Sequence, residues 1–387
     1  MDVLLIYQRI LQFLKNIICR DGFTLILQSY NELRHMFVLR SLLLSFLFAQ
    51  FLPAQEVKSA RNINDIPVFI YHRVGDSRFP STNVSKEVFE NHLKYLNNND
   101  FNVVTLSDAL AYVQKGRSAP EKTVVLTIDD GYRSFYENGA PLLEKYGFPV
   151  TVFINTRQVG ASGFMGWKEL NELIDRGIEI HNHSHSHDYF VNYDLKTLKT
   201  EFRNDLEKSH RIFKEKLGYV PEIFSYPFGE FNPEMKEILK EFGYLAAVGQ
   251  HSGVISENSD KFNLPRFPMT GIYASLEKFQ NRVNMKSLPA ELLNKLGNPI
   301  VDTENPPELR IKLLKPDLIN TESLQCFVAG SSDCRIEYDQ ENELIIMKAN
   351  SKLENRRTLY TITGQSTSVS WQWYWWSFLW VIPDIKE

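Results

Sequence analysis

The stretch with the most unusual chemistry is IEIHNHSHSHDY, residues 178–189, in which histidines stand at every second position. They are His181, His183, His185 and His187. On a β-strand all four side chains would share one face, whereas on a helical turn they would pair at i, i+4. Imidazole is a common ligand of transition metals, but His-rich tracts also occur as solvated loops. The spacing alone therefore leaves a metal site and a solvated loop open.

A second chemical feature is the pair of adjacent carboxylates Asp129 and Asp130 in TIDDGY. Neighbouring strand residues point in opposite directions, so at a strand end the two carboxylates can border one pocket at different points. One can ligate a metal while the other stays free as a base. An Asp and two His with an open position are a typical catalytic zinc set, although Asp-Gly alone is also a common turn.

The elements that would position these residues are short apolar runs alternating with amphipathic helices. The runs cover 66–72, 103–106, 122–131, 149–155, 178–182, 222–227 and 244–249, and the helices lie near 85–96, 107, 140–147, 167–175, 195–217 and 233–242. This alternation predicts an α/β fold with a parallel sheet or barrel. Active sites of such folds gather at the carboxyl ends of the strands, where His72, Asp129, Asp130, His183 and the segment from Ser225 all stand.

The motifs together resemble the polysaccharide deacetylase family, the NodB-homology carbohydrate esterases, over residues 64–285. TIDDGY matches the family's T-[FI]-D-D-G, and NHSHSH matches N-H-[ST]-x-x-H through His183 and His187. The resemblance implies a distorted (β/α) barrel. It also implies Asp130, His183 and His187 as ligands of a divalent metal and Asp129 as the catalytic base. The other two histidines of the run would be spectators.

The third family motif, R-x-P-[YF]-G, is matched only by Pro227, Phe228 and Gly229, because Ser225 stands at the arginine position. In the family that arginine orients the catalytic aspartate. A candidate substitute is Arg266 in NLPRFPM, since a guanidinium can hold a carboxylate bidentately from another strand. A surface arginine beside two prolines is the alternative.

His72, at the end of the run PVFIYH, resembles the Y-H motif of the poly-N-acetylglucosamine deacetylase branch. That resemblance implies a general acid, a role that suits the near-neutral pKa of imidazole; a structural histidine is the alternative. In the implied mechanism the metal polarises the acetamide carbonyl and Asp129 takes a proton from water. The segment from Tyr226 to Gly229 contributes a backbone N–H near Phe228 to the oxyanion site, and His72 protonates the leaving amine.

We therefore expect a metal-dependent N-deacetylase of an N-acetylglucosamine-containing polysaccharide, with Zn²⁺ as the favoured ion and Co²⁺ or Ni²⁺ as alternatives. A non-catalytic carbohydrate-binding protein on a degenerate deacetylase fold is the rival, because the motif arginine is missing. A phosphoester hydrolase is disfavoured by the lack of an arginine cluster or a Gly-rich phosphate loop. A net charge of −4 gives no basic excess for nucleic acid. The expected partner is a glycan. The identity of the glycan and the oligomeric state of the protein stay open.

The N-terminal part predicts export. The segment 36–55 has a basic residue, an apolar run and small residues, which is the layout of a secretory signal peptide; the run is short for a membrane span. We expect residues 1–35 to be a mis-assigned leader and 36–60 a signal peptide with a short linker. The destination is then the periplasm, the cell envelope or the medium. An uncleaved anchor is the alternative.

The C-terminal part has a different pattern. We expect the catalytic domain to cover 61–290, and 291–387 to hold a Pro/Asn-rich linker and a small all-β sandwich. Cys326 and Cys334 flank FVAGSSD and, in an exported protein, could close a hairpin as a disulfide; two reduced cysteines are the alternative. The aromatic run SVSWQWYWWSFLWVIP is either a platform for sugar rings or a partner, or a core strand with an edge packed on the catalytic domain.

Overall fold

The computed structural model describes most of the chain beyond its N-terminal part. The described residues are 65–114, 118–294, 299–300, 304–330 and 333–386. The expected leader (1–35) and signal peptide (36–60) lie outside them. In the described ranges, we find no helix with the length and apolar character needed to cross a bilayer.

A nine-stranded sheet builds the first part of the described chain, in the order β10-β1-β5-β6-β7-β8-β9, with β11 beside β1 and β4 beside β5. Its strands are β1 (Ile66–Tyr71), β4 (Asn102–Val104), β5 (Thr123–Ile128), β6 (Thr151–Ile154), β7 (Glu179–Asn182), β8 (Ile223–Ser225), β9 (Ala246–Val248), β10 (Val254–Ile255) and β11 (Phe267–Pro268). All its pairings are parallel except that of β10 with β1. Every residue of β1, β5 and β6 is buried, as a parallel sheet covered on both faces requires.

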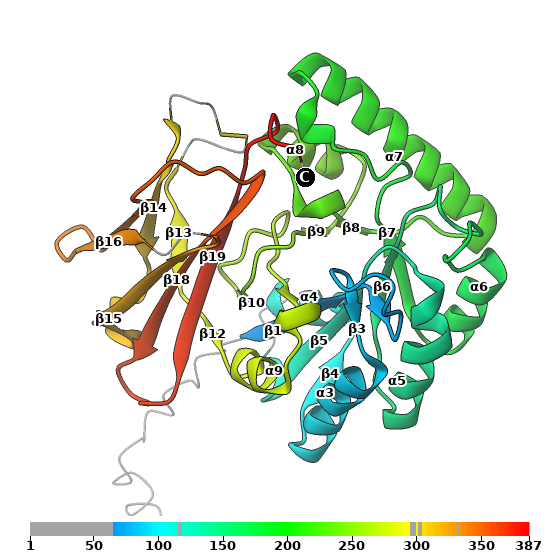
Figure 1. Ribbon diagram of the computed structural model, residues 1–387, viewed down its shortest axis with the longest axis horizontal. Helices are drawn as coiled ribbons and strands as arrows, with labels where there is room; N and C mark the ends of the chain where they lie inside the picture. The colour runs from blue at the N-terminus through cyan, green and yellow to red at the C-terminus, as the bar shows by residue number, and fades with distance from the viewer. Residues whose placement is uncertain (1–64, 115–117, 295–298, 301–303, 331–332, 387) are drawn as a thin grey trace, which may run out of the picture. The chain divides into compact units, whose positions relative to one another are not determined.

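Seven α-helices accompany this sheet in the described residues. They are α3 (Lys86–Asn98), α4 (Leu106–Gln114), α5 (Ala140–Tyr146), α6 (Trp167–Asp175), α7 (Leu195–Leu217), α8 (Pro233–Glu241) and α9 (Leu276–Val283). Helices α5, α6 and α7 lie along the outer side of the curved sheet (Figure 1). Ser85 is the N-cap of α3, since its side chain accepts a hydrogen bond from the backbone N–H of Val88 at 3.1 Å.

The curved sheet is closed by one irregular segment, residues 264–268. Leu264 bridges to Val248 at the end of β9, and β11 pairs with β1 through Phe267 and Phe69. The segment therefore joins the two edges of the sheet and carries Arg266, which is fully buried. A small parallel pair, β2 (Arg73–Val74) with β3 (Asn83–Val84), lies beyond the end of β1.

The C-terminal part consists of two four-stranded sheets, β12-β19-β18-β15 and β13-β14-β17-β16 (Figure 1). The strands are β12 (Lys286–Ser287), β13 (Ala290–Leu292), β14 (Glu308–Leu313), β15 (Ile319–Val328), β16 (Cys334–Asp339), β17 (Leu344–Ala349), β18 (Arg357–Ser366) and β19 (Trp373–Val381). One apolar cluster that includes Ile311, Met347, Tyr360 and Phe378 draws side chains from both sheets, and Cys326 forms a disulfide with Cys334. The expected fold class, α/β with a smaller all-β part, is confirmed.

Candidate metal centre and catalytic pocket

The sequence-predicted site residues stand where parallel strands end. His72 follows β1, Asp129 and Asp130 follow β5, and His183 follows β7. Because these strands run in the same direction, their carboxyl ends meet at one edge of the sheet. His72, Asp130 and His183 consequently line one pocket, although they are far apart in the chain, and Asp129 is buried beside them.

Asp130, His183 and His187 form a cluster in which each residue offers one ligand atom. The Oδ1 atom of Asp130 lies 3.4 Å from Nε2 of His183 and 3.4 Å from Nε2 of His187. The two Nε2 atoms are 3.1 Å apart. A tetrahedral ion with bonds of about 2.0 Å separates its ligand atoms by about 3.3 Å, so these three atoms already have the spacing of one face of such a polyhedron.

The surroundings of the cluster favour a bound cation. The Nδ1 atom of His183 lies 2.8 Å from the carbonyl oxygen of Ser225, so an Nδ1–H donor there leaves Nε2 as a metal ligand. Burial raises the pKa of Asp130, but hydrogen bonds from His183 and His187 outweigh burial and lower it well below its usual value. Asp130 is therefore an anion, as a ligand has to be, and these residues fit a divalent ion such as Zn²⁺.

Backbone strain concentrates at this centre. Of the seven described non-glycine residues with positive φ, four belong to it: Asp130, Ser184, His187 and Phe228, with φ of 70°, 68°, 54° and 60°. Such conformations cost on the order of 1–3 kcal/mol each and persist where the surrounding structure imposes them. The backbone at this centre therefore adopts unfavourable conformations that bring the side chains of the centre together.

The other two histidines of the run contact different groups. The Nδ1 atom of His185 lies 3.0 Å from the hydroxyl of Thr156. His181 lies beside the ring of Phe153 at 5.9 Å, with its Nε2 atom 3.6 Å from Glu179. Neither belongs to the cluster of ligand atoms found among the described residues.

Asp129 is fully buried next to the cluster and is held by Arg266 and Ser225. The guanidinium of Arg266 donates to both carboxylate oxygens of Asp129, at 2.7 and 2.8 Å, and the Ser225 hydroxyl donates to Oδ2 at 2.9 Å. Burial raises the pKa of Asp129, but the charge of Arg266 and the nearby His183 outweigh it, so the pKa is lowered overall. Arg266 is thus a buried partner of Asp129 and not a surface residue.

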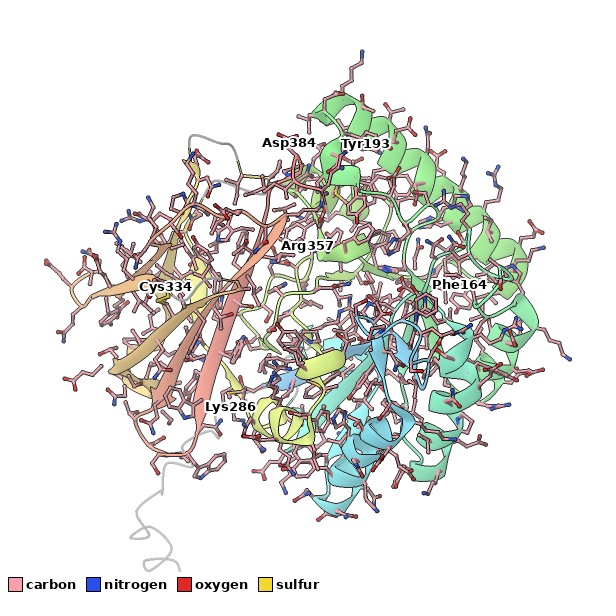
Figure 2. All side chains as sticks on the ribbon, in the orientation of Figure 1. Phe164, Tyr193, Lys286, Cys334, Arg357 and Asp384 are labelled. Carbon is pink, nitrogen blue, oxygen red and sulfur yellow. A yellow bond between two sulfur atoms is a disulfide. The ribbon has the colours of Figure 1, made fainter. Side chains whose placement is uncertain are left out.

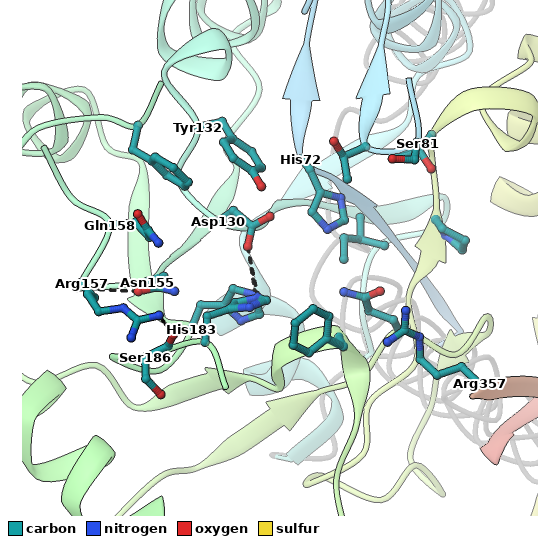
Figure 3. Close-up of a pocket in the computed structure, with 18 residues that line it drawn as sticks. His72, Ser81, Asp130, Tyr132, Asn155, Arg157, Gln158, His183, Ser186 and Arg357 are labelled. Carbon is teal, nitrogen blue, oxygen red and sulfur yellow. Dashed lines mark hydrogen bonds and ion pairs between the residues drawn. The ribbon is translucent and has the colours of Figure 1, made fainter. Parts of the chain in front are cut away.

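His72 faces Asp130 and His183 across the pocket (Figure 3). Burial lowers the pKa of its imidazole and outweighs the nearby charges of Asp130 and Asp129, which raise it. Its Nδ1 atom is buried and has no hydrogen-bond partner among the described residues. The His72 side chain also lines the pocket.

The segment 226–229 divides its side chains between the pocket and the core. Phe228 lines the pocket, where its ring stacks on Tyr189 at 3.9 Å and meets His187 at 4.5 Å. Tyr226 is buried and donates its hydroxyl to the carbonyl of Phe262; Pro227 is buried beside it. Gly229 has φ of 72°, and a Cβ there would lie 2.6 Å from the backbone N of Gln250, so only glycine fits the turn.

The pocket above the cluster has a volume of about 600 Å³. Its wall includes three residues that the motifs did not single out: Tyr132, Arg157 and Arg357. Tyr132 directly follows the TIDDG motif and was therefore open to prediction. Arg157 and Arg357 lie on opposite sides of the pocket (Figure 3), and no local pattern marks either of them.

Arg357 reaches the pocket from β18, where the C-terminal sheets meet the α/β part (Figure 2). It donates to Glu230 at 3.0 Å, and its neighbour Arg356 forms a bidentate pair with the same carboxylate, both bonds at 2.7 Å. Arg356 and Glu230 are 6% and 3% exposed. The C-terminal sheets are thereby tied to the loop that carries Phe228.

A family model described as polysaccharide deacetylase matches residues 116–247. Among curated proteins, a poly-beta-1,6-N-acetyl-D-glucosamine N-deacetylase of Staphylococcus aureus is 29% identical over 216 residues, which are 53% of this chain and 74% of that protein.

Among solved structures, the deacetylase PplD of Streptococcus pyogenes, in complex with acetate, has a TM-score of 0.52 at 18% identity, covering 57% of this chain and 98% of that one. IcaB of Ammonifex degensii has a TM-score of 0.50 at 24% identity, covering 57% of this chain and 97% of that one. These two similarities bear on the fold of the α/β part.

Proposed function

Residues 116–247 belong to the polysaccharide deacetylase family, and from that premise we propose that the protein hydrolyses the N-acetyl groups of an N-acetylglucosamine polysaccharide and releases acetate. The observation that carries the proposal is the Asp130–His183–His187 cluster at the base of a pocket of about 600 Å³. The pocket is large enough for a sugar ring, and the residues that line it include Asp130, His183, His187 and His72, which are groups that amide hydrolysis can use.

The proposed roles follow from position. When bound, a divalent ion, for which we favour Zn²⁺ over Co²⁺ or Ni²⁺, polarises the acetamide carbonyl and activates water. Asp129 is the general base, with its Oδ2 atom 3.9 Å from Nε2 of His183 and its orientation set by Arg266. His72 stands on the opposite wall as the general acid for the leaving amine. Phe228 and its backbone N–H border the place of the carbonyl oxygen.

The polymer most directly suggested is β-1,6-linked poly-N-acetylglucosamine, because the curated relative is named for it. Peptidoglycan and chitin-like oligomers are the alternatives to be compared with it. We also propose export to the periplasm, cell envelope or medium, supported by the Cys326–Cys334 disulfide, since disulfides persist in oxidising compartments.

The rival function, glycan binding without turnover, was motivated by Ser225 at the motif arginine position. The bidentate contact of Arg266 with Asp129 favours catalysis instead, because the guanidinium that the motif lacks is supplied from residue 266.

The deciding experiment is acetate release from the three glycans, before and after chelation and after re-addition of Zn²⁺, Co²⁺ or Ni²⁺. We expect metal-dependent release from at least one glycan and a rate reduced about 10²–10⁴-fold in Asp129→Asn, the usual contribution of a general base. Binding of the glycans without acetate release under any metal would favour the rival function.

A further inference from the structure

The aromatic run of the C-terminal part is split between the two faces of one sheet. In β19 the side chains alternate, and Tyr374, Phe378 and Trp380 point into the apolar core between the two sheets. Trp373, Trp375 and Ser377 lie on the opposite face. Across the sheet the register places Trp375 beside Thr363 and Thr363 beside Gln325, so this outer face continues across three strands.

Only part of the outer face is covered by the α/β part. Trp375 packs edge-on against Phe267 and donates its indole N–H to the carbonyl of Ser252, and Ser377 donates to the same carbonyl. Beyond this contact the face is open: Phe327 on β15 is 51% exposed and Trp371, in the β18–β19 loop, is 67% exposed. One part of the aromatic run is therefore packed against the α/β part, and another part is exposed.

The open part forms a cleft of about 620 Å³ between the outer face and α9, which lies beside β19 in Figure 1. The aromatic rings and Gln325 lie on the sheet side of the cleft, and Gln280 and Asn281 of α9 lie on the other side. The residues that matter here are Trp371, Trp373, Phe327, Gln325, Gln280 and Asn281. Of the described residues that line this cleft, none is charged, and none also lines the catalytic pocket.

We propose that this cleft is a second glycan-binding site, which holds a neutral N-acetylated sugar chain. A sugar ring presents C–H groups on its faces and hydroxyl and amide groups around its rim. The faces suit the amphipathic Trp and Phe rings, and the rim suits amides such as Gln325, Gln280 and Asn281, which can both donate and accept.

The lack of charge separates this ligand class from others. An anionic polymer or a nucleic acid would call for Arg or Lys in the cleft. A neutral, amide-rich cleft with exposed rings matches a polyhydroxylated ligand. The N-acetylated identity rests on the proposed function, whereas binding itself does not require turnover.

A second site on the same chain would act by raising the local concentration of polymer near the catalytic pocket. The second site is therefore expected to lower KM for long glycan chains and to leave the rate of the chemical step unchanged. Short oligomers that cannot span both sites would gain nothing from it.

Titration calorimetry of the metal-loaded full chain with a β-1,6-linked N-acetylglucosamine hexamer tests the proposal. We expect two binding sites in the unaltered protein and the loss of one in Trp371→Ala, seen as at least about tenfold weaker binding at that site, as for truncation of a ring that anchors a ligand. Trp371→Phe keeps a stacking face and should retain most of the affinity. Leu245→Ala, at an exposed apolar residue that does not line the cleft, is the matched control.

Kinetics with the same variants separate this proposal from the proposed function. Trp371→Ala should raise KM for the polymer several-fold and leave kcat for a short oligomer unchanged. Two-site binding without any acetate release would refute the proposed function and leave the second site standing. Unaltered binding and KM in both Trp371→Ala and Trp373→Ala would overturn the second site, as would a dimer that dissociates on these substitutions while glycan binding stays the same.

Discussion

Replacing Arg266 with methionine is the sharpest test of how the site is held together. The change keeps an unbranched side chain of similar reach in a buried position but removes the guanidinium. Arg266 makes five hydrogen bonds: two to Asp129, and one each to Ser225, Thr127 and the carbonyl of Gly249. The substitution leaves the carboxylate of Asp129 buried with the Ser225 hydroxyl as its remaining side-chain donor.

The size of the effect follows from these contacts. Each bond to a charged group contributes about 1.5–3 kcal/mol, and removing one partner of a buried pair costs about 3–5 kcal/mol. We expect Arg266→Met to lose about 3–5 kcal/mol of unfolding free energy, measured by chemical denaturation. We also expect kcat for acetate release to fall about 10²-fold, the loss typical of a catalytic group displaced by about 1 Å.

A double-mutant cycle separates positioning from general damage. If Arg266 acts through Asp129, then Arg266→Met should reduce kcat much less in the Asp129→Asn background than alone. Arg266→Lys is the control that keeps the charge but loses the bidentate geometry, and it should recover only part of the activity. Ser225→Arg combined with Arg266→Ser, which returns the guanidinium to the motif position, should also recover part of it. Full kcat in Arg266→Met, or multiplicative losses in the cycle, would refute this reasoning.

Three further predictions concern the metal, pH and the C-terminal sheets. His187→Ala should abolish binding of Zn²⁺ measured by calorimetry, whereas His185→Ala should leave it nearly intact; equal losses would contradict the assigned ligand set. Burial lowers the pKa of His92 from 6.5 to about 4. As the pH falls between these values the unfolded chain takes up this proton before the folded chain does, so the free energy of unfolding should decrease by up to about 3 kcal/mol. Urea unfolding of His92→Gln should lack this dependence of the unfolding free energy on pH, and an unchanged dependence would contradict the assignment. Arg356→Met leaves Glu230 buried without its bidentate partner and should cost about 3–5 kcal/mol in denaturation, whereas a loss below about 1 kcal/mol would show that the pair does not hold the sheets in place.

Local sequence patterns were sufficient to predict the helices and strands of the α/β part and the class of protein. The predicted helices over 167–175 and 195–217 correspond to α6 and α7 with the same bounds, because amphipathic periodicity and caps are properties of the local chain. The Asp-Asp-Gly and Asn-His motifs also stand at the ends of strands, and the apolar residues directly before each motif are sufficient to predict those strands. The predicted family and class of enzyme, a polysaccharide N-deacetylase that cleaves a carbon–nitrogen amide bond, are confirmed by the family match and the named relative.

Local patterns left several contacts open. The spacing of Cys326 and Cys334 suggested a disulfide that closes a hairpin. The structure contains the disulfide, but it links β15 of one C-terminal sheet to β16 of the other, because these two strands do not pair. The motifs also did not reveal that Arg357 of β18 reaches the pocket, since it comes from the C-terminal sheets. Contacts between distant segments have no signature within either segment.

The sequence by itself determined which residue types could perform the chemistry and which strand ends would carry them, since both depend on spacing within single segments. Only the tertiary structure decided that Arg266 reaches Asp129, 137 positions away, because the contact depends on residues 264–268 closing the sheet between β9 and β1. The same holds for the aromatic run. Its alternation predicts two faces, but packing against the α/β part decides which rings are covered and which remain open to a ligand.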